Sequence, residues 1–281
     1  MADPALARRV LVERRAASRS PLATARLAPW SPLSMEMMAV RERLIASGFA
    51  RGDRRQVRTM LGSSIQYWPS FAASWNDLPV DIYMADGGRY RRRRFAAFFV
   101  APAVIARKPH RPHFQSRTHN PLNGGIERWF DPVKADIGDN PLIQAMLQMR
   151  GNLFSTLSQD GVEPGGWHVE MHQFRICTMV QPRAEPTPEG THRDGVDWVL
   201  VLLTNRRNVQ GGKTRIVNTD GELLDEFTLT SAQETVFLND RRIRHAVTPI
   251  WAKDATAPGF RDVLVLTVRL ARAAGAAVTE G

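Results

Sequence analysis

The chain has 281 residues, 43% of them hydrophobic, and a formal net charge of +10. This length fits one large domain, and no apolar run approaches the ~18 residues of a membrane-spanning helix, so a soluble protein is expected. The charge comes mainly from scattered arginines, which is more typical of biased codon usage than of a nucleic-acid-binding surface. Cys177 is the only cysteine, which excludes an intrachain disulfide and agrees with a cytoplasmic location.

The N-terminal part predicts an arm followed by a helix. Residues 1–33 are rich in Arg, Ala and Ser and are expected to form a mobile or loosely docked arm, with a transit peptide as the alternative. Residues 34–281 are expected to form one domain, mixed α/β over 34–160. Residues 34–48 carry an apolar stripe at helical spacing that ends at a glycine, which predicts a helix.

The next hundred residues are mixed. Trp68, Phe71 and Trp75 are expected core aromatics, and residues 89–104 predict a strand or hairpin. Within it, residues 91–94 (RRRR) are expected to form a solvated charged strand with one member reaching a site. A polar loop over 107–133 precedes a second expected helix over 137–159, where apolar residues recur at helical spacing.

Short apolar runs dominate the region from residue 161 to 281. Turn residues such as those of 182–190 and 205–212 separate them, and no helical pattern intervenes. Seven or eight short strands in this arrangement predict an antiparallel sandwich or jelly roll. The expected fold is therefore mainly β with flanking helices.

Three residues in this β region have the chemistry of a metal site. His192 and Asp194 precede the apolar run 196–204, and His245 lies near the start of a later run. Residues i and i+2 of an extended chain share a face, so both side chains can reach one ion. Two imidazoles and one carboxylate form the facial triad of non-haem iron(II). An exposed turn with a surface ion pair is the alternative, and Asp240 is expected to be a turn residue.

An arginine follows the third of these residues. Arg261 opens the last strong apolar run, 261–270. An arginine buried in a β core needs an anion, and a planar guanidinium suits a carboxylate. The far carboxylate of 2-oxoglutarate fits this requirement, whereas a surface ion pair with Asp262 is the alternative.

The segments 191–216 (THRDGVDWVLVLLTNRRNVQGGKTRI), 239–250 (NDRRIRHAVTPI) and 261–270 (RDVLVLTVRL) resemble iron(II)/2-oxoglutarate dioxygenases with a double-stranded β-helix core. Within that superfamily they are most similar to bacterial hydroxylases of free amino acids, such as L-isoleucine and pipecolate hydroxylases. The resemblance is clearest over residues 165–270 and implies a jelly-roll, cupin-like core over 161–281.

The resemblance also implies site residues and cofactors. His192, Asp194 and His245 match the iron ligands, and Arg261 matches the arginine that receives the 2-oxoglutarate carboxylate. Val263 departs from the family, which often has serine there, so Thr267 is a candidate substitute and Gln173 a further cosubstrate contact. The implied reaction uses Fe(II), O2 and 2-oxoglutarate, releases succinate and CO2, and hydroxylates an unactivated C–H bond of an aliphatic or cyclic L-amino acid.

Substrate contacts are expected from a loop and a strand. The loop offers Asn120, Asn123 and Glu127. In residues 168–180, alternation places Gln173 and Arg175 on one face and His172 on the other, and the Gln173/Arg175 face is the predicted pocket wall. The histidines at 110, 113 and 168 are expected to be structural or exposed.

Two other functions are compatible with these patterns. One is a nucleic-acid demethylase of the same superfamily, although the second arginine typical of such enzymes is replaced by Thr267. The other is a cupin-like or metal-free binding module. The expected partner is a small amino acid rather than nucleic acid or a membrane, and a homodimer is compatible with the chain.

Overall fold

The structure is a computed structural model that describes residues 31–102, 104–157, 165–178 and 183–271. The predicted arm, residues 1–33, lies outside the described residues except for its last three. No helix of the described residues is long and apolar enough to cross a membrane.

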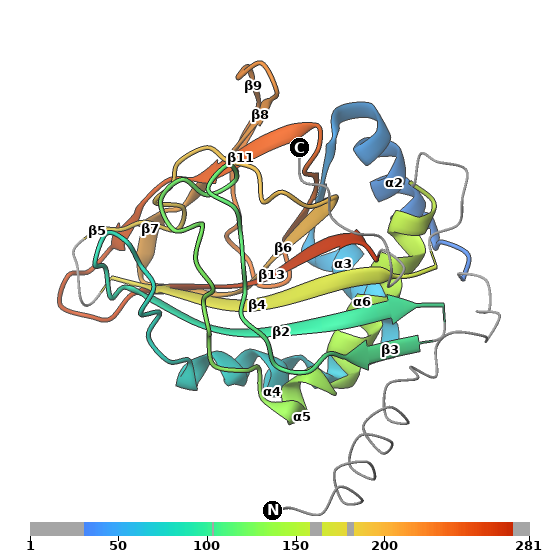
Figure 1. The fold of residues 1–281 in the computed structure, drawn as a ribbon, viewed down its shortest axis with the longest axis horizontal. Coiled ribbons are helices and arrows are strands. Elements are labelled where there is room, and N and C mark those ends of the chain that lie inside the picture. The colour runs from blue at the N-terminus through green and yellow to red at the C-terminus, as the bar shows by residue number, and fades with distance from the viewer. Residues whose placement is uncertain (1–30, 103, 158–164, 179–182, 272–281) are drawn as a thin grey trace, which may run out of the picture.

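A seven-stranded antiparallel sheet forms the main layer (Figure 1). Its strand order is β1-β10-β6-β13-β4-β2-β3. The strands are β1 (Phe49–Gly52), β10 (Thr235–Asn239), β6 (Trp198–Arg207), β13 (Phe260–Leu270), β4 (Trp167–Cys177), β2 (Arg91–Ala101) and β3 (Val104–Arg107). The N-terminal region thus adds strands to the same sheet as the C-terminal region.

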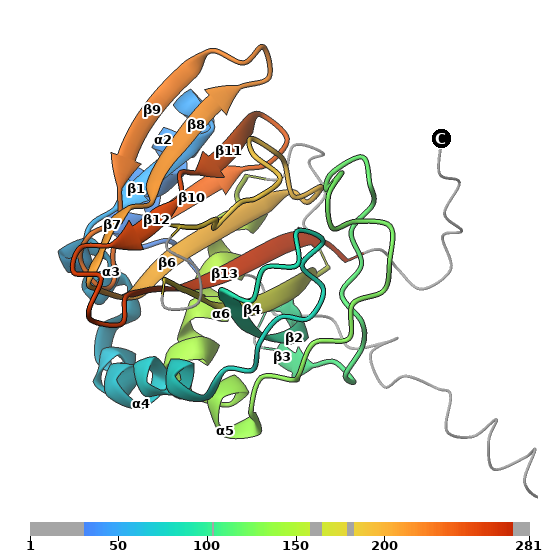
Figure 2. The ribbon, with the colours of Figure 1, turned by 90° about the vertical axis from the view of Figure 1, so that its left-hand side faces the viewer.

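Two three-stranded sheets pack on one face of the main sheet (Figure 2). One contains β11 (Ile243–Val247), β8 (Lys213–Asn218) and β9 (Leu223–Thr228), and the other β5 (Arg183–Ala184), β12 (Ile250–Ala252) and β7 (Val209–Gly211). Apolar residues from both layers fill the space between them, for example Ile216 and Ile243 against Leu203 and Val263. The predicted jelly-roll architecture is confirmed.

Helices cover the opposite face of the main sheet (Figure 1). They are α2 (Met35–Ser47), α3 (Arg54–Leu61), η1 (Gly62–Tyr67), α4 (Trp68–Ala73), η2 (Ser74–Asp77), α5 (Ala135–Gly138) and α6 (Pro141–Ser155). The helix expected over 34–48 is confirmed, with Ser34 capping its first turn and Gly48 ending it in the left-handed region.

The second predicted helix begins later than expected. The stretch expected as one helix over 137–159 is interrupted at Asn140, whose side chain accepts a hydrogen bond from the Leu142 N–H at the start of α6. Pro141 has no N–H to continue a preceding helix and is well suited to a first helical position. The pattern of apolar residues ran across this break and so concealed it.

The inner face of the main sheet is a grid of side chains set by strand register. Residues 91, 93, 95 and 97 of β2 pair with 176, 174, 172 and 170 of β4, which pair with 261, 263, 265 and 267 of β13. Because side chains alternate along a strand, these residues point to the same side. The grid forms one wall of the functional site.

Candidate active site

His192, Asp194 and His245 converge at the edge of the three-stranded β11-β8-β9 sheet. The backbones of His192 and His245 exchange two hydrogen bonds, with N···O distances of 3.0 and 2.9 Å. Nε2 of each ring lies 3.7 Å from an Asp194 carboxylate oxygen, and the three ligand atoms all lie within 4.8 Å of one another. This arrangement can hold one metal ion.

The ring of His192 is oriented for metal binding. Its Nδ1 lies 3.0 Å from the Gly190 carbonyl oxygen, so Nδ1 carries a proton and donates it, and in the neutral ring that a metal requires the Nε2 lone pair faces Asp194. Burial opposes protonation of this ring, but Asp194 and Glu189 outweigh it and raise the pKa of His192 to about 9. Burial, with repulsion from His192, lowers the pKa of His245 to about 4. At neutral pH and without a metal, the His192 ring is therefore charged and the His245 ring is neutral.

Asp240 fixes the loop that carries Asp194. Its fully buried carboxylate accepts hydrogen bonds from the backbone N–H groups of Asp194, Gly195 and Val196, at 2.9, 2.8 and 3.0 Å. Burial and the neighbouring Asp194 carboxylate raise the pKa of Asp240 to about 6. The expectation of a plain turn residue was therefore incomplete, because this side chain holds a ligand-bearing loop in place.

A second group with potential ligands lies on the inner grid. His113 Nδ1 and His168 Nε2 lie 3.0 and 3.2 Å from the Glu170 carboxylate, and His172 Nε2 lies 3.8 Å from it. The other ring nitrogens of His172 and His168 face Arg93 and Lys108, at 2.7 and 2.8 Å.

These partners decide the protonation of the second group. Arginine and lysine only donate hydrogen bonds, so Nδ1 of His172 and of His168 must accept, and Nε2 of each ring carries the proton toward Glu170. A metal-binding histidine normally donates its second N–H to a carbonyl or carboxylate, as His192 does and these rings cannot. Of the two groups, the His192 group is the one built for a metal. The other is a hydrogen-bonded anchor for the Glu170 carboxylate.

Arg261 lies buried between the layers, with a partner that sequence reasoning missed. It is 2% exposed, and its Nε and Nη2 atoms have no hydrogen-bond partner. Arg206 is directly opposite on β6 and also has a buried, unpartnered Nη1. Burial, with repulsion from Arg206, lowers the pKa of Arg261 to about 10. Facing guanidinium groups destabilise a sheet unless an anion lies between them, so this pair can bind a carboxylate.

Thr267 and Gln173 lie away from this arginine pair. Thr267 is six residues beyond Arg261 on β13, about 20 Å in an extended strand, so the two cannot share a carboxylate. Gln173 points to the helix side of the main sheet, where its Nε2 donates to Ser74 Oγ at 2.7 Å. Gln173 therefore points away from the cavity, whereas Thr267 lines the cavity but lies too far from Arg261 to share its carboxylate.

The predicted pocket wall on β4 was the wrong face. Arg175 lies on the helix side with Gln173 and forms two 2.7 Å contacts with the Asp262 carboxylate. The cavity is lined instead by the alternate residues His168, Glu170, His172 and Phe174. Alternation correctly divided the strand into two faces, but only packing against the helices decided which face is inward.

The predicted loop residues have different positions. Asn120 lines the cavity, and its Nδ2 donates to Gln115 Oε1 at 3.1 Å. Asn123 is buried within the loop, and its Oδ1 accepts a hydrogen bond from the Ala85 N–H, whereas Glu127 is exposed. Neither Asn123 nor Glu127 lines the cavity, so the cavity gives no support to a direct substrate contact for either residue.

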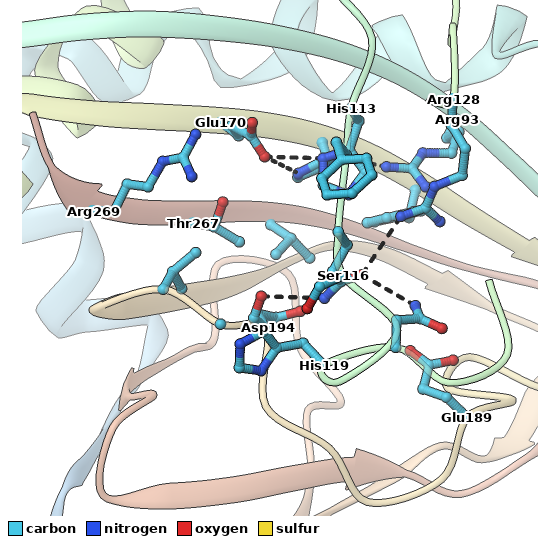
Figure 3. Close-up of a pocket in the computed structure, with 18 of the residues that line it drawn as sticks. Arg93, His113, Ser116, His119, Arg128, Glu170, Glu189, Asp194, Thr267 and Arg269 are labelled. Atoms are coloured by element: carbon cyan, nitrogen blue, oxygen red, sulfur yellow. Dashed lines mark hydrogen bonds and ion pairs between the residues drawn. The ribbon is translucent and has the colours of Figure 1, made fainter. Parts of the chain in front are cut away.

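The cavity has a volume of about 320 Å³ and reaches the His192 group at Asp194 (Figure 3). Asp194 contributes to its wall, opposite side chains from β2, β4 and β13. Arg91 and Arg93 also line it, so the run of four arginines is not a solvated strand with one member inward. The period of two separates these buried arginines from the exposed Arg92, a signal present in the sequence.

Comparisons with known proteins agree with this geometry. The chain is 27% identical over 157 residues to 3(1)-hydroxy-L-isoleucine 4-dioxygenase of Pantoea ananatis, covering 56% of this chain and 63% of that protein. It is 29% identical over 157 residues to L-isoleucine-4-hydroxylase of Bacillus thuringiensis, covering 55% and 64% respectively. The match thus spans less than two thirds of either relative.

Solved structures extend the similarity to most of the fold. A bsmA homologue from Methylobium petroleophilum superposes with a TM-score of 0.77 at 33% identity, covering 88% of this chain and 96% of the other. IDO from Bacillus thuringiensis has a TM-score of 0.69 at 19% identity, with 88% and 100% covered, and so supports the fold alone. The family model of the 2OG-Fe dioxygenases matches residues 72–267, a range that includes all three ligand candidates and Arg261. The chain therefore belongs to the 2OG-Fe dioxygenase family.

Proposed function

We propose that the protein is an Fe(II)/2-oxoglutarate dioxygenase that hydroxylates an unactivated C–H bond of a free aliphatic or cyclic L-amino acid. The observation that carries the proposal is the His192/Asp194/His245 group, in which the Gly190 carbonyl directs the His192 Nε2 lone pair toward Asp194. The two relatives named for isoleucine and hydroxyisoleucine support the amino-acid class.

The family's cofactors are Fe(II), 2-oxoglutarate and O2. His192, Asp194 and His245 would hold the iron, and their two imidazoles and one carboxylate suit it. When bound, iron couples O2 reduction to decarboxylation of 2-oxoglutarate into succinate and CO2 and to oxidation of the substrate C–H bond. The chain's residues hold the ligands in place, orient both organic molecules and exclude water.

The arginine pair would hold the cosubstrate's far carboxylate. Arg261 supplies two unpartnered donors and Arg206 supplies one, all shielded from water. Arg206 is kept near Arg261 because its other terminal nitrogen donates to the Gly211 carbonyl at 2.8 Å. Arg206 would thus take the place of the hydroxyl that Val263 lacks.

Succinate formation tests the proposal directly. We expect wild-type protein with Fe(II), 2-oxoglutarate and ascorbate to release succinate, and a free L-amino acid to accelerate it. His192→Ala should abolish this release, whereas His110→Ala, at an exposed ring, should retain it. Equal succinate formation by His192→Ala and wild type would show that the assigned site is not the iron site.

Arg206→Gln tests the cosubstrate assignment. The variant removes a charge-assisted contact, so the KM for 2-oxoglutarate should rise ~10- to 100-fold. Arg207→Gln, at the next and exposed position, is the matched control and should leave this KM unchanged. Equal values for the two variants would exclude Arg206 from the cosubstrate site.

The cytoplasmic location and a homodimer remain predictions. Fractionation of cells and sedimentation analysis of the purified protein measure them. The membership of the 2OG-Fe dioxygenase family argues against a metal-free binding module.

A further inference from the structure

Three arginines with unused donors gather at one end of the cavity. Arg91, Arg93 and Arg128 are 6%, 3% and 2% exposed, and all line the cavity. Each keeps a buried nitrogen without a hydrogen-bond partner: Nη2 of Arg91, Nε of Arg93 and Nε of Arg128. Unused donors of this kind are costly in a protein interior and indicate a binding site for an acceptor.

The positive charge at this end is only partly balanced. Asp81 pairs with Arg91 at 2.7 Å and lies 3.8 Å from Arg93. Among the described residues, no carboxylate forms an ion pair with Arg128, and burial with repulsion from Arg91 lowers its pKa. Asp81 therefore pairs with two of the three guanidinium groups and leaves Arg128 without an ion pair, so a further anion would relieve the repulsion.

Aromatic rings hold two of these arginines in place. The Arg93 guanidinium carbon lies 3.6 Å from the centroid of the Phe130 ring and 4.4 Å from that of Phe174. The Arg128 guanidinium carbon lies 5.7 Å from the same Phe130 centroid. The two guanidinium groups are thus fixed near each other before a ligand arrives, which favours tight binding of a planar carboxylate (Figure 3).

A complementary acceptor lines the same cavity. The Glu189 side chain is 9% exposed, its Oε2 has no hydrogen-bond partner, and its Oε1 lies 3.5 Å from His192 Nε2. Glu170, the other cavity carboxylate outside the His192 group, already accepts ring N–H groups. Glu189 therefore has the free capacity to receive a cation next to the expected iron position.

We propose that this end of the cavity binds the zwitterionic head of the amino-acid substrate, the carboxylate at Arg93 and Arg128 and the ammonium at Glu189. The inference rests on the proposed function and deepens it. Val196 and Val265 line the cavity as well and provide an apolar surface for an aliphatic side chain. The site would therefore select free α-amino acids over amines, amides and hydroxy acids.

Substrate analogues test the head-group site without any mutation. The free amino acid that most accelerates wild-type succinate release, from a panel including L-isoleucine and L-pipecolate, is compared with its amide and its 2-hydroxy acid. The amide lacks the carboxylate charge and the hydroxy acid lacks the ammonium. Each analogue should have a kcat/KM lower by ~10- to 100-fold. An amide as good as the free acid would overturn the proposal.

Variants then assign each contact. Arg128→Gln should lower kcat/KM for the amino acid but not for its amide, so the preference between them collapses, and Arg128→Lys should restore part of it. Glu189→Gln should collapse the preference for the amino acid over the hydroxy acid. Arg92→Gln changes an exposed arginine on the other face of β2 and should leave both preferences unchanged. Arg128→Gln and Arg92→Gln with the same preference would refute the assignment.

The outcomes separate this inference from the function on which it rests. Absence of any succinate in the wild type refutes the dioxygenase proposal itself. Succinate release that no free amino acid accelerates leaves the iron chemistry standing and refutes the head-group site. If Arg128→Gln fails to fold, as thermal unfolding would show, the wild-type analogue series and Glu189→Gln still decide.

Discussion

Replacement of Asp240 by asparagine should weaken metal binding although Asp240 itself does not belong to the ligand group. Its carboxylate accepts three backbone N–H groups of the 194–196 segment at 2.8 to 3.0 Å, one on Oδ1 and two on Oδ2. An asparagine has one acceptor oxygen, and its NH2 group would face an N–H donor where the second oxygen had been. At best the variant keeps the two bonds of one oxygen and leaves the Asp194 N–H unsatisfied.

The magnitude follows from the number of bonds lost. Hydrogen bonds to charged groups contribute roughly 1.5–3 kcal/mol each, and a buried donor left unpaired costs a similar amount. The free energy of unfolding of Asp240→Asn should therefore decrease by at most about 2–4 kcal/mol, because the neutral side chain also relieves the burial cost and the repulsion from Asp194 that raise the pKa of Asp240. Because the lost bond holds the Asp194 backbone, Mn(II) affinity should decrease ~10- to 100-fold, as for other residues that orient metal ligands.

The assay combines calorimetric titration of metal-free protein with Mn(II) and urea unfolding, both at about pH 8, above the raised pKa of Asp240. Asp197→Asn is the matched control, because this nearby carboxylate pairs with Arg241 and does not contact the 194–196 backbone. It should retain the wild-type affinity. An Asp240→Asn protein that unfolds more easily yet binds Mn(II) as tightly as wild type would refute the link between this carboxylate and the ligand loop.

Two further predictions concern acid stability and loop geometry. Four largely shielded histidines have a pKa below the ordinary value, chiefly because burial disfavours the charged ring: His113, His168, His172 and His245. Below about pH 6.5 the unfolded chain binds protons that the folded chain does not. Each ring should therefore lower the free energy of unfolding as the pH decreases, by up to ~1.4 kcal/mol per pH unit. Urea unfolding of metal-free protein between about pH 7 and 5 measures the slope, which also contains the opposite contribution of Asp240 and Asp262, because the pKa of each is raised to about 6. His113→Asn should reduce the loss of stability toward acid pH and the exposed His110→Asn should not; equal slopes for the two variants would contradict the assigned protonation state of His113. Gly195 and Gly221 both have a positive φ, +77° and +92°. A Cβ at Gly195 would lie 2.4 Å from the His119 ring, whereas a Cβ at Gly221 would have no other atom within 4 Å. Gly221→Ala should therefore cost only the backbone strain of ~1–2 kcal/mol, and Gly195→Ala should cost more and weaken Mn(II) binding, so equal effects would exclude the clash.

Local patterns in the sequence were sufficient for the β-rich fold, the α2 helix and the three ligand candidates. Apolar runs bounded by turns mark strands wherever they pair, and the two-residue spacing of His192 and Asp194 is meaningful without knowledge of the partner strand. Arg261 was recognisable for a similar reason, since a charge that opens an apolar strand requires an anion.

Contacts between distant segments decided the rest of the site. Strand alternation divides β4 into two faces but contains no information on which one the helices cover, so the Gln173/Arg175 face was chosen wrongly. The pairing of Arg206 with Arg261 depends on β6–β13 register, and the three hydrogen bonds of Asp240 join segments over forty residues apart. The protonation of His172 and His168 likewise follows from Arg93 on β2 and from Lys108, the residue after β3. The sequence by itself therefore determined which groups could carry the chemistry, and only tertiary packing determined which of them meet, because side-chain partners across a sheet are set by register and layer contacts rather than by sequence spacing.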